Sequence, residues 1–458
     1  MAGIGLRLQN IIAKGTYLQS LTAYLSSAII SSGPWLSSVI AFAVLSTSVL
    51  TFLSQDARLL LFGTITYAYG VSLLISGAPQ MILTRYLADR LYVDDVSQVA
   101  PTCTGVIVAA TPCVLLTAPF LVFAPFTLVY RLMAVALCMT LTYIWLVVVF
   151  LSAGRDYVRI LLIFIFSYMV SIAAITLLGN TLGVTGSLAG FLIGQLLCLS
   201  LLIARVYREF TPNRGVSFAF LGYIGKYWDL GLIGLIYSVG IWADNAIFWW
   251  APHGSIVIAG FFRLNPDYDS TKLIAYLTTI PASATFLVHL ESNFYRHYRD
   301  YFKSIRDKKT LGKIIEHKNG MMEAVQSGLV AISLIQGGVG AVLYLLAPNL
   351  AIVLHKNSDW VQLLRFIIIG VSVQIVMFSI FILLLYLDER RPALIVVATF
   401  MLVNCLGTAL SVRLGPSFYG VGYLLGAAIS TGIGIYYLTD RLQRLDYLTF
   451  MTQPIQRS

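Results

Sequence analysis

Charged residues are scarce in this sequence. Of its 458 residues only 11% are Asp, Glu, Lys or Arg, whereas 58% are hydrophobic, and the mean hydropathy is +0.84. Soluble globular domains carry about 25% charged residues. The composition therefore excludes a soluble protein. It predicts an all-α protein that crosses a membrane many times, because a lone apolar segment of about 20 residues spans a bilayer as a helix.

Cysteine is also rare, and its spacing matches no metal site or disulfide framework. The five cysteines fall in apolar segments, where cysteine behaves as a small buried hydrophobic residue. No Ser/His/Asp, H-E-x-x-H, phosphate-binding-loop or G-x-G-x-x-G arrangement stands in a usable context. The sequence thus predicts no enzyme active site, no metal and no cofactor. The cysteines are Cys103, Cys113, Cys138, Cys198 and Cys405.

Long hydrophilic loops are missing as well. The longest is 294–321, so there is no room for a catalytic domain outside the membrane. No cleavable signal peptide is apparent, because the first apolar segment is too long for one, and we expect it to be retained. The sequence predicts twelve spans, at 18–48, 59–83, 99–123, 128–153, 158–178, 187–207, 228–251, 271–291, 322–347, 360–387, 392–412 and 419–440.

The formal net charge of +10 is explained by topology. With the N-terminus inside, the cytoplasmic segments hold 23 Lys and Arg residues and the outer segments hold six. Such an excess is the positive-inside signal of bacterial membrane proteins. We therefore expect both termini in the cytoplasm and no nucleic-acid partner.

The spans divide into two sets of six, which indicates an internal duplication. Each half has an even number of spans, so both halves begin inside, as parallel repeats. In transporters of this kind the substrate path lies between the repeats. The predicted parts are an interfacial N-terminal segment (1–17), an N-lobe (18–207), a basic cytoplasmic linker (208–226), a C-lobe (227–440) with its cytoplasmic loop (294–321), and a cytoplasmic tail (441–458).

Asp244 is the most unusual residue of the spans. In a helix that begins at Trp228, it lies roughly 6 Å beyond the midplane. A carboxylate there costs on the order of 3 kcal/mol, so we expect it to face the bundle interior or a wet cavity. Two roles for Asp244 are open. In the functional one it is a proton- or ion-linked acid, or it accepts a hydrogen bond from the substrate. In the structural one it pairs with Arg365 of span ten or with Arg131 of span four. Both arginines are alternatively placed to reach the outer headgroups.

Two residues beside Asp244 suggest sugar recognition. Trp242, Asn245 and Trp249 share one helix face, and an aromatic face beside an amide suits a sugar ring. For Trp249 and Trp250 we favour an aromatic belt at the outer interface. Trp242 is too deep for that belt and remains a candidate for the transport cavity, together with Asn245.

The cytoplasmic loop 294–321 predicts an amphipathic helix along the membrane surface, in which Phe294, Tyr298, Tyr301, Phe302 and Ile305 form one face. Its basic residues either anchor the loop by the positive-inside rule or bind a cytoplasmic partner. The candidate docking residues are Arg296, Arg299, Lys303, Arg306, Lys308 and Lys309.

Several stretches of the sequence resemble the Pel exopolysaccharide transporter family (PelG). The resemblance rests on Met1-Ala2-Gly3-Ile4-Gly5, on Ser32-Gly33-Pro34-Trp35 and on Asn265-Pro266-Asp267-Tyr268-Asp269 with the residues that follow. The later matches are Ala275-Tyr276-Leu277, Ile280-Pro281, Phe286-Leu287, Glu291 and Phe294-Tyr295.

That family is similar to the multidrug/oligosaccharidyl-lipid/polysaccharide flippase superfamily. The resemblance implies two six-helix lobes around a central cavity, without catalytic chemistry. It further implies export of a galactosamine-type polymer across the bacterial inner membrane. The implied partners are a cytoplasmic glycosyltransferase, a cyclic-di-GMP-sensing membrane protein and a membrane protein with tetratricopeptide repeats.

Three other functions remain open. A flippase for lipid-linked oligosaccharide, or a multidrug-type exporter of the same superfamily, would need a cation or pyrophosphate site. An integral-membrane sugar polymerase or ligase would need clustered catalytic groups at one face, which the short outer loops do not offer. A scaffold that only assembles its partners would leave export unaffected when its cavity is blocked.

Overall fold

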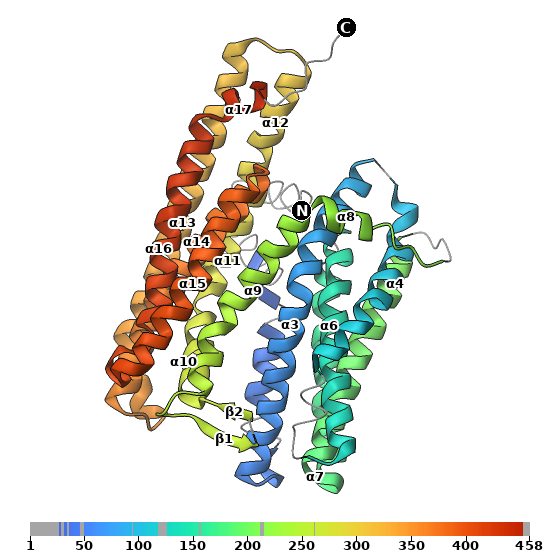
Figure 1. Cartoon of the computed structure of the whole chain (residues 1–458), viewed down its shortest axis with the longest axis vertical. Coiled ribbons are helices and arrows are strands. Elements are labelled where there is room, and N and C mark those ends of the chain that lie inside the picture. Colours follow the sequence, from blue (N-terminus) through green and yellow to red (C-terminus); the bar gives the residue numbers. More distant parts are fainter. Residues whose placement is uncertain are drawn as a thin grey trace, which may run out of the picture. The chain divides into compact units, whose positions relative to one another are not determined.

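Helices make up most of the part of the chain that the computed structural model describes (Figure 1). The predicted N-terminal segment 1–17, most of the first span (18–48) and the last residues of the tail lie outside this part. The described residues are 27–28, 32–33, 36–45, 50–93, 95–117, 126–154, 157–210, 215–260 and 262–451.

The chain forms two compact units. Among the described residues, unit 1 contains those within 28–269, and unit 2 contains Ser27 and residues 270–451. The change from one unit to the other thus falls after the Asn-Pro-Asp-Tyr-Asp motif, later in the chain than the linker 208–226 at which the sequence analysis divides the two lobes. That division into six-helix lobes stays a prediction.

Unit 1 is a bundle of long apolar helices with a continuous hydrophobic core. Tyr86, Phe150 and Phe191 are among its largest fully buried side chains. Its elements are η2 (Leu50–Phe52), α3 (Gln55–Tyr92), η3 (Val96–Gln98), α4 (Val99–Ala110), η4 (Thr111–Thr117), α6 (Leu128–Ala153), α7 (Tyr157–Glu209), α8 (Leu221–Lys226), α9 (Trp228–Trp249), β1 (Ile256–Ala259), β2 (Phe262–Leu264) and the start of α10 (Pro266–Leu277).

Helix α7 is a hairpin of two antiparallel halves. Its 53 residues would reach about 80 Å as one straight helix, far beyond a hydrocarbon core of about 30 Å. The chain reverses at Gly183, whose φ of 62° and ψ of −139° suit only glycine. Beyond the turn, Gly190 lies so close to Ile175 that an added Cβ would stand 2.5 Å from the Ile175 nitrogen. The two halves correspond to predicted spans five and six.

Helices α3 and α9 cross in close contact. A Cβ added to Gly234 would stand 2.2 Å from the carbonyl oxygen of Gly77, and one added to Gly77 would stand 2.9 Å from that of Gly234. Only glycine on both helices permits this approach, as is common in membrane bundles. The Gly77-Ala78-Pro79 stretch therefore serves this crossing. Close by, Trp242 of α9 covers Gly70 of α3.

A short β-hairpin joins α9 to α10. Strands β1 and β2 pair antiparallel, with Ile256 opposite Leu264 and Val257 opposite Arg263. Helix α10 then begins at Pro266, five residues before the predicted start of span eight, and ends at Leu277; α11 (Thr279–Val288) completes the span. Pro281 stands in the first turn of α11, where proline is tolerated, and the break comes before it.

Unit 2 packs its helices around a second apolar core. Phe381, Phe400 and Tyr423 are fully buried there. Gln336 of α13 donates to the hydroxyl groups of Thr278 (2.9 Å) and Ser372 (3.1 Å), which ties three helices together. After α11 its elements are η5 (His289–Phe294, a π-helical turn), α12 (Tyr295–Arg306), α13 (Leu311–Val353), α14 (Ser358–Tyr386), α15 (Arg390–Leu414), η6 (Pro416–Phe418), α16 (Val421–Gln443) and α17 (Leu445–Met451).

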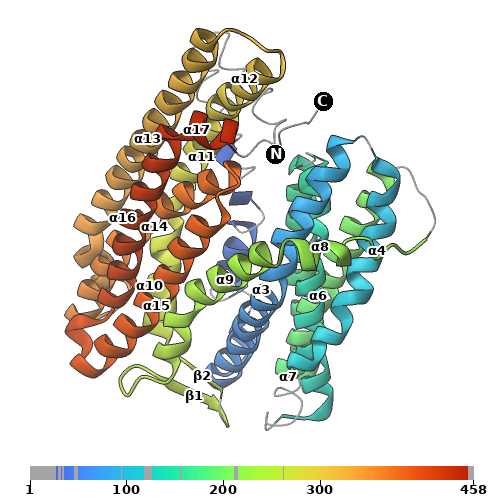
Figure 2. The same cartoon turned by 45° about the horizontal axis from the view of Figure 1, so that its top comes forward.

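Helix α12 forms a hairpin with α13, which corrects the expectation that it lies along the membrane surface. Figure 2 shows α12 beside one end of α13. His297 packs against Gly320 of α13. A Cβ added to Gly320 would stand only 2.8 Å from the His297 Nδ1. The buried hydroxyl of Tyr301 donates to Asp446 of α17 (2.9 Å), and Lys318 of α13 pairs with the same carboxylate (2.6 Å). Helices α12 and α17 and the adjoining end of α13 are therefore held together, and we call this part of unit 2 the α12–α13 platform.

Ten helical segments of the described residues are long and apolar enough to span a membrane. Predicted spans two to twelve all correspond to one of them, because α7 contains two spans. Helix α6 matches its predicted bounds, and α9 ends two residues before its predicted end. The first span lies mainly outside the described residues, so the total of twelve stays a prediction.

Candidate functional site

Asp244 is fully buried in unit 1 and accepts a hydrogen bond from a tyrosine. The donor is the hydroxyl of Tyr268, in the first turn of α10 and equally buried. The Tyr268 ring also stacks on Phe248 of α9, with 3.8 Å between centroids and 21° between planes. The acid that the sequence singled out therefore joins the end of α9 to the start of α10, in the interior of the bundle.

Asn265 connects the same two helices through their backbones. Its Oδ1 accepts from the Tyr268 nitrogen (3.1 Å), which caps the N-terminus of α10. Its Nδ2 donates to the carbonyl groups of Phe248 (3.3 Å) and His253 (3.4 Å) beside the C-terminus of α9. One buried amide thus satisfies backbone groups that both helix ends would otherwise leave unpaired.

Asp269 receives two further donors from α9. The Asn245 amide donates to its carboxylate at 2.6 Å, and the Trp249 indole donates to both its oxygens, at 3.0 and 3.2 Å. The carboxylate is also in the first turn of α10, where the helix dipole favours a negative charge. We call the set Asp244, Asn245, Trp249, Asn265, Tyr268 and Asp269 the α9–α10 network.

Aromatic side chains of α3 and β2 cover the network. Tyr67 stacks on Trp249, with 4.5 Å between ring centroids, and meets the edge of Phe262 at 5.2 Å. The Tyr67 hydroxyl donates to the Arg263 carbonyl (2.8 Å) and accepts from its amide (3.2 Å). The hairpin is therefore fixed to α3, and it holds α10 in register with α9.

Of the three tryptophans in the second half of α9 and at its C-terminus, the structure changes the interpretation of Trp249. Trp249 does not belong to an interfacial belt, because its indole is buried and bonded to Asp269. Trp250 is 56% exposed, with the Arg263 guanidinium 4.7 Å from its ring centroid, as expected at an interface. Trp242 is half-buried on α9, with its ring 6.3 Å from that of Trp249, and it remains the candidate for sugar stacking.

The arginines proposed as partners of Asp244 have different surroundings. Arg131 is the fourth residue of α6, at the start of that helix in unit 1. Arg365 belongs to α14 in unit 2, where its guanidinium lies 4.7 Å from the Tyr344 ring centroid. A pairing of either arginine with Asp244 stays a prediction.

Sequence reasoning missed the partners of Asp244 and Asn245. Tyr268 and Asp269 were noted only as part of a family motif, although an acid just past a short outer loop signals a helix start near the outer end of α9. It also counted Lys272, the second residue of predicted span eight, among the six basic residues of the outer segments. Lys272 is buried on α10, with its ammonium 5.0 Å from the ring centroid of Tyr423.

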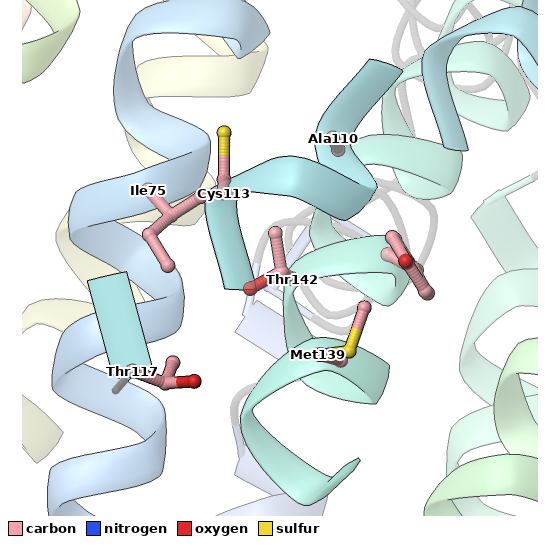
Figure 3. A pocket seen from close by; sticks show the side chains of 7 residues that line it. Ile75, Ala110, Cys113, Thr117, Met139 and Thr142 are labelled. Atoms are coloured by element: carbon pink, nitrogen blue, oxygen red, sulfur yellow. The ribbon is translucent and has the colours of Figure 1, made fainter. Parts of the chain in front are cut away.

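The cavity of unit 1 in Figure 3 is too small for a sugar. It lies between α3, η4 and α6, with Ile75, Cys113 and Thr142 around it, and measures about 10 Å³, the space of a single water at most. Among the described residues no group of three or more His, Cys, Asp or Glu is placed to hold a metal ion.

The basic residues proposed for docking are all exposed on or just after α12. Arg299 and Arg306 approach their neighbours Asp300 (3.4 Å) and Asp307 (3.9 Å), which are weak surface contacts. The α12–α13 platform therefore presents a basic surface, formed by Arg296, Arg299, Lys303, Arg306, Lys308 and Lys309.

The family to which the protein belongs accounts for this architecture. Residues 1–450 match a family model described as "PelG: Putative exopolysaccharide Exporter (EPS-E)". The chain belongs to the PelG family. The α9–α10 network thus gives the Asn-Pro-Asp-Tyr-Asp stretch of this PelG-family protein a structural role, which the resemblance alone did not supply.

Solved structures with a similar fold are transporters. An outward-facing multidrug resistance MATE family transporter of the MOP superfamily has a TM-score of 0.61 at 15% identity, over 93% of this chain and 96% of that chain. A MOP superfamily transporter from Pyrococcus furiosus has a TM-score of 0.59 at 16% identity, over 93% and 96%. No curated protein matches in sequence at a significant level.

Family and fold together fix the general function. This PelG-family protein is a multi-pass membrane protein with a MATE-like fold, and its family and fold are those of a transporter, not those of an enzyme. Its fold is that of about twelve helices in two lobes, as the sequence analysis expected.

Proposed function

We propose that the protein moves a Pel-type, galactosamine-containing exopolysaccharide from the cytoplasm to the periplasm across the bacterial inner membrane. The observation that carries this proposal is the family match over residues 1–450 of a chain with a transporter fold. The excess of basic residues in the predicted cytoplasmic segments supports the orientation, with both termini in the cytoplasm.

The first experiment separates transport from synthesis. Cells that lack this chain, but keep the glycosyltransferase, should stop secreting polymer while polymer accumulates in the cytoplasm. Secretion at the normal rate would contradict the proposal. Loss of polymer from both compartments would indicate a role in synthesis or scaffolding.

We also propose that the α9–α10 network takes part in the transport cycle through the carboxylate of Asp244. Its carboxylate is buried and joined to Tyr268, so a change in its charge alters the bond between the two helices. Asp244→Asn keeps the size of the side chain and an acceptor oxygen. If a proton gradient drives export, this variant should lose export and remain inserted in the membrane.

The chain offers a matched control for this variant. Asp229 stands in the first turn of α9, so Asp229→Asn removes a carboxylate from the opposite end of the same helix. It should export normally, because a surface charge at a helix N-terminus contributes only about 0.3–1 kcal/mol to stability. Normal export by Asp244→Asn would remove the acid from the mechanism.

The remaining members of the predicted transport cavity are Trp242, Asn245, Arg131 and Arg365. Trp242 is the one with a half-exposed aromatic face, on which a sugar ring can stack. Trp242→Phe should keep most export, whereas Trp242→Ala should reduce it. Equal export by both variants would exclude stacking at this position.

For the partners, we propose that the basic surface of the α12–α13 platform docks a cytoplasmic glycosyltransferase of a complex that also contains a cyclic-di-GMP receptor. All six basic side chains are exposed, and Lys303, Lys308 and Lys309 form no ion pair among the described residues. Lys303→Glu with Lys309→Glu should weaken co-purification of the enzyme and make it more sensitive to salt. The same reversal at Arg444, which already pairs with Asp440, is the control.

A second candidate function is the export of a small molecule or the flipping of a lipid-linked oligosaccharide. The similarity in fold to multidrug MATE transporters favours it. Drug resistance conferred by the chain alone, or a lipid-linked cargo in its absence, would support this alternative. Export that requires the glycosyltransferase would speak against it.

A further inference from the structure

Unit 2 contains a second, larger cavity with an arginine in its wall. The cavity has a volume of about 530 Å³ and lies between α13 and α14. Its polar wall consists of Tyr344, Ser358, Gln362 and Arg365. A volume in this range accommodates a small molecule or a lipid headgroup.

Of the described residues that line this cavity, Arg365 alone carries a charged side chain. Its guanidinium rests on Tyr344, 4.7 Å from the ring centroid, and its buried Nε has no hydrogen-bond partner among the described residues. None of the described acidic residues forms an ion pair with it. Arg365 is half-buried, and a guanidinium in the wall of a largely apolar cavity favours an anion with oxygen acceptors.

The depth of Arg365 matches the phosphate level of a bilayer. Helix α14 has 29 residues, about 44 Å, which is the thickness of a bilayer with its headgroups. Arg365 is seven residues, or roughly 10 Å, from the start of this helix at Ser358. It therefore lies close to the boundary between headgroups and hydrocarbon, on the predicted outer side.

The rest of the wall and its surroundings are apolar. Pro348, Val361, Phe366 and Ile369 complete the cavity, and Ile369 is 40% exposed. Beside Tyr344 on α13, Leu345 is 73% exposed and Leu346 49%, as expected of a surface that faces lipid. A free anion would leave this apolar wall uncovered, whereas an acyl chain would cover it.

We propose that this cavity binds an anionic phospholipid from the outer leaflet. The phosphate accepts hydrogen bonds from Arg365, the headgroup hydroxyls lie beside Gln362 and Ser358, and an acyl chain follows Val361, Phe366 and Ile369. This lipid would stabilise the α13–α14 pair. A lipid bound here would place Arg365 outside the transport path to which the sequence analysis assigned it. Export of the polymer rests on the family match, so the two proposals stand or fall separately.

The test measures lipid binding to the purified full chain in detergent by native mass spectrometry. The probes are phosphatidylglycerol, phosphatidylcholine and inorganic phosphate. Phosphatidylglycerol should be retained best, and Arg365→Gln should weaken its binding by about tenfold or more, as expected when a charge-assisted hydrogen bond is lost. Arg413→Gln, at the exposed end of α15, removes the same charge elsewhere and should have no effect.

A second variant keeps the test valid if Arg365→Gln does not fold. Val361→Trp narrows the cavity from its apolar side without touching the arginine, and it should also reduce phosphatidylglycerol retention. Unchanged retention in both variants would overturn the proposal. Displacement of the lipid by inorganic phosphate at equal concentration would show a site for the free anion and would overturn the lipid assignment.

Discussion

The bond between Tyr268 and Asp244 offers a direct measure of what holds α9 to α10. Tyr268→Phe removes the hydroxyl that donates to Asp244 and keeps the ring that stacks on Phe248. The core remains filled, so no cavity term enters, unlike the 3–5 kcal/mol that truncation of an aromatic residue to alanine costs. The loss is therefore that of one buried hydrogen bond.

The size of this loss depends on the charge of the acceptor. A bond to an ionised carboxylate contributes about 1.5–3 kcal/mol, and one to a neutral group contributes about 0.5–1.5 kcal/mol. Since both residues are fully buried, no water replaces the missing donor. We expect Tyr268→Phe to lower the free energy of unfolding by about 2 kcal/mol if Asp244 is ionised.

A double-mutant cycle isolates this interaction. Unfolding is followed by tryptophan fluorescence in mixed micelles for the wild type, Tyr268→Phe, Asp244→Leu, which removes the acceptor at similar size, and the double variant. The coupling energy should be about 2 kcal/mol for an ionised acid and below about 1 kcal/mol for a neutral one. Tyr436→Phe, at a position that is 69% exposed, is the control and should be within about 0.5 kcal/mol of the wild type.

Two results would refute this reasoning. If Tyr268→Phe is as stable as the control variant, the hydrogen bond does not hold the helices together. If the coupling energy is near zero while both single variants are destabilised, the two residues act through other neighbours.

The other predictions concern the α9–α10 corner, the α7 hairpin and the α12–α13 platform. Asn265→Ser keeps the helix cap but loses two amide donors, so it should be less stable than the wild type and more stable than Asn265→Ala, by unfolding midpoints in detergent. Gly183→Ala should cost about 1–2 kcal/mol because its φ is positive, and Gly190→Leu should prevent assembly of the hairpin, as size-exclusion profiles would reveal. Burial lowers the pKa of His297, and the charge of Arg296 lowers it further. The neutral imidazole therefore contributes its full stabilisation of the folded state above the usual histidine pKa of about 6.5, and this stabilisation is lost as the pH falls through the lowered pKa. Proteolysis of the platform should therefore accelerate as the pH falls below about 6.5, and His297→Gln should abolish this acceleration. Equal acceleration in the variant would show that another group titrates.

The α9–α10 network also explains why a short motif is needed at this place. Asn265 caps α10, Pro266 fits its first position, and two acidic residues follow where the helix dipole favours them. Tyr268 and Asp269 then bind the two polar residues that α9 carries in its apolar span. Each residue of the motif thus has a contact or a position in the helix that suits its type.

The sequence by itself determined the membrane character and the order of the spans, and for α6 and α9 it also placed the bounds to within two residues. Hydrophobic segments of span length are local properties, so α6 and α9 could be located from residue types alone. A buried acid in such a segment also signals its own importance, because lipid does not solvate it. The tight turn at Gly183 was located only as the gap between two predicted spans.

The tertiary structure decided what the polar residues bind. Asp244 and Tyr268 are 24 residues apart, joined through a hairpin whose register no local pattern fixes. Proximity of Trp249 to the membrane surface suggested an aromatic belt, but its burial depends on Tyr67 of another helix. Likewise, the apolar face of an amphipathic helix such as α12 can pack either on lipid or on another helix. Only the tertiary structure shows that it packs on α13. Partners of this kind are set by how helices meet in three dimensions, which one sequence does not encode locally.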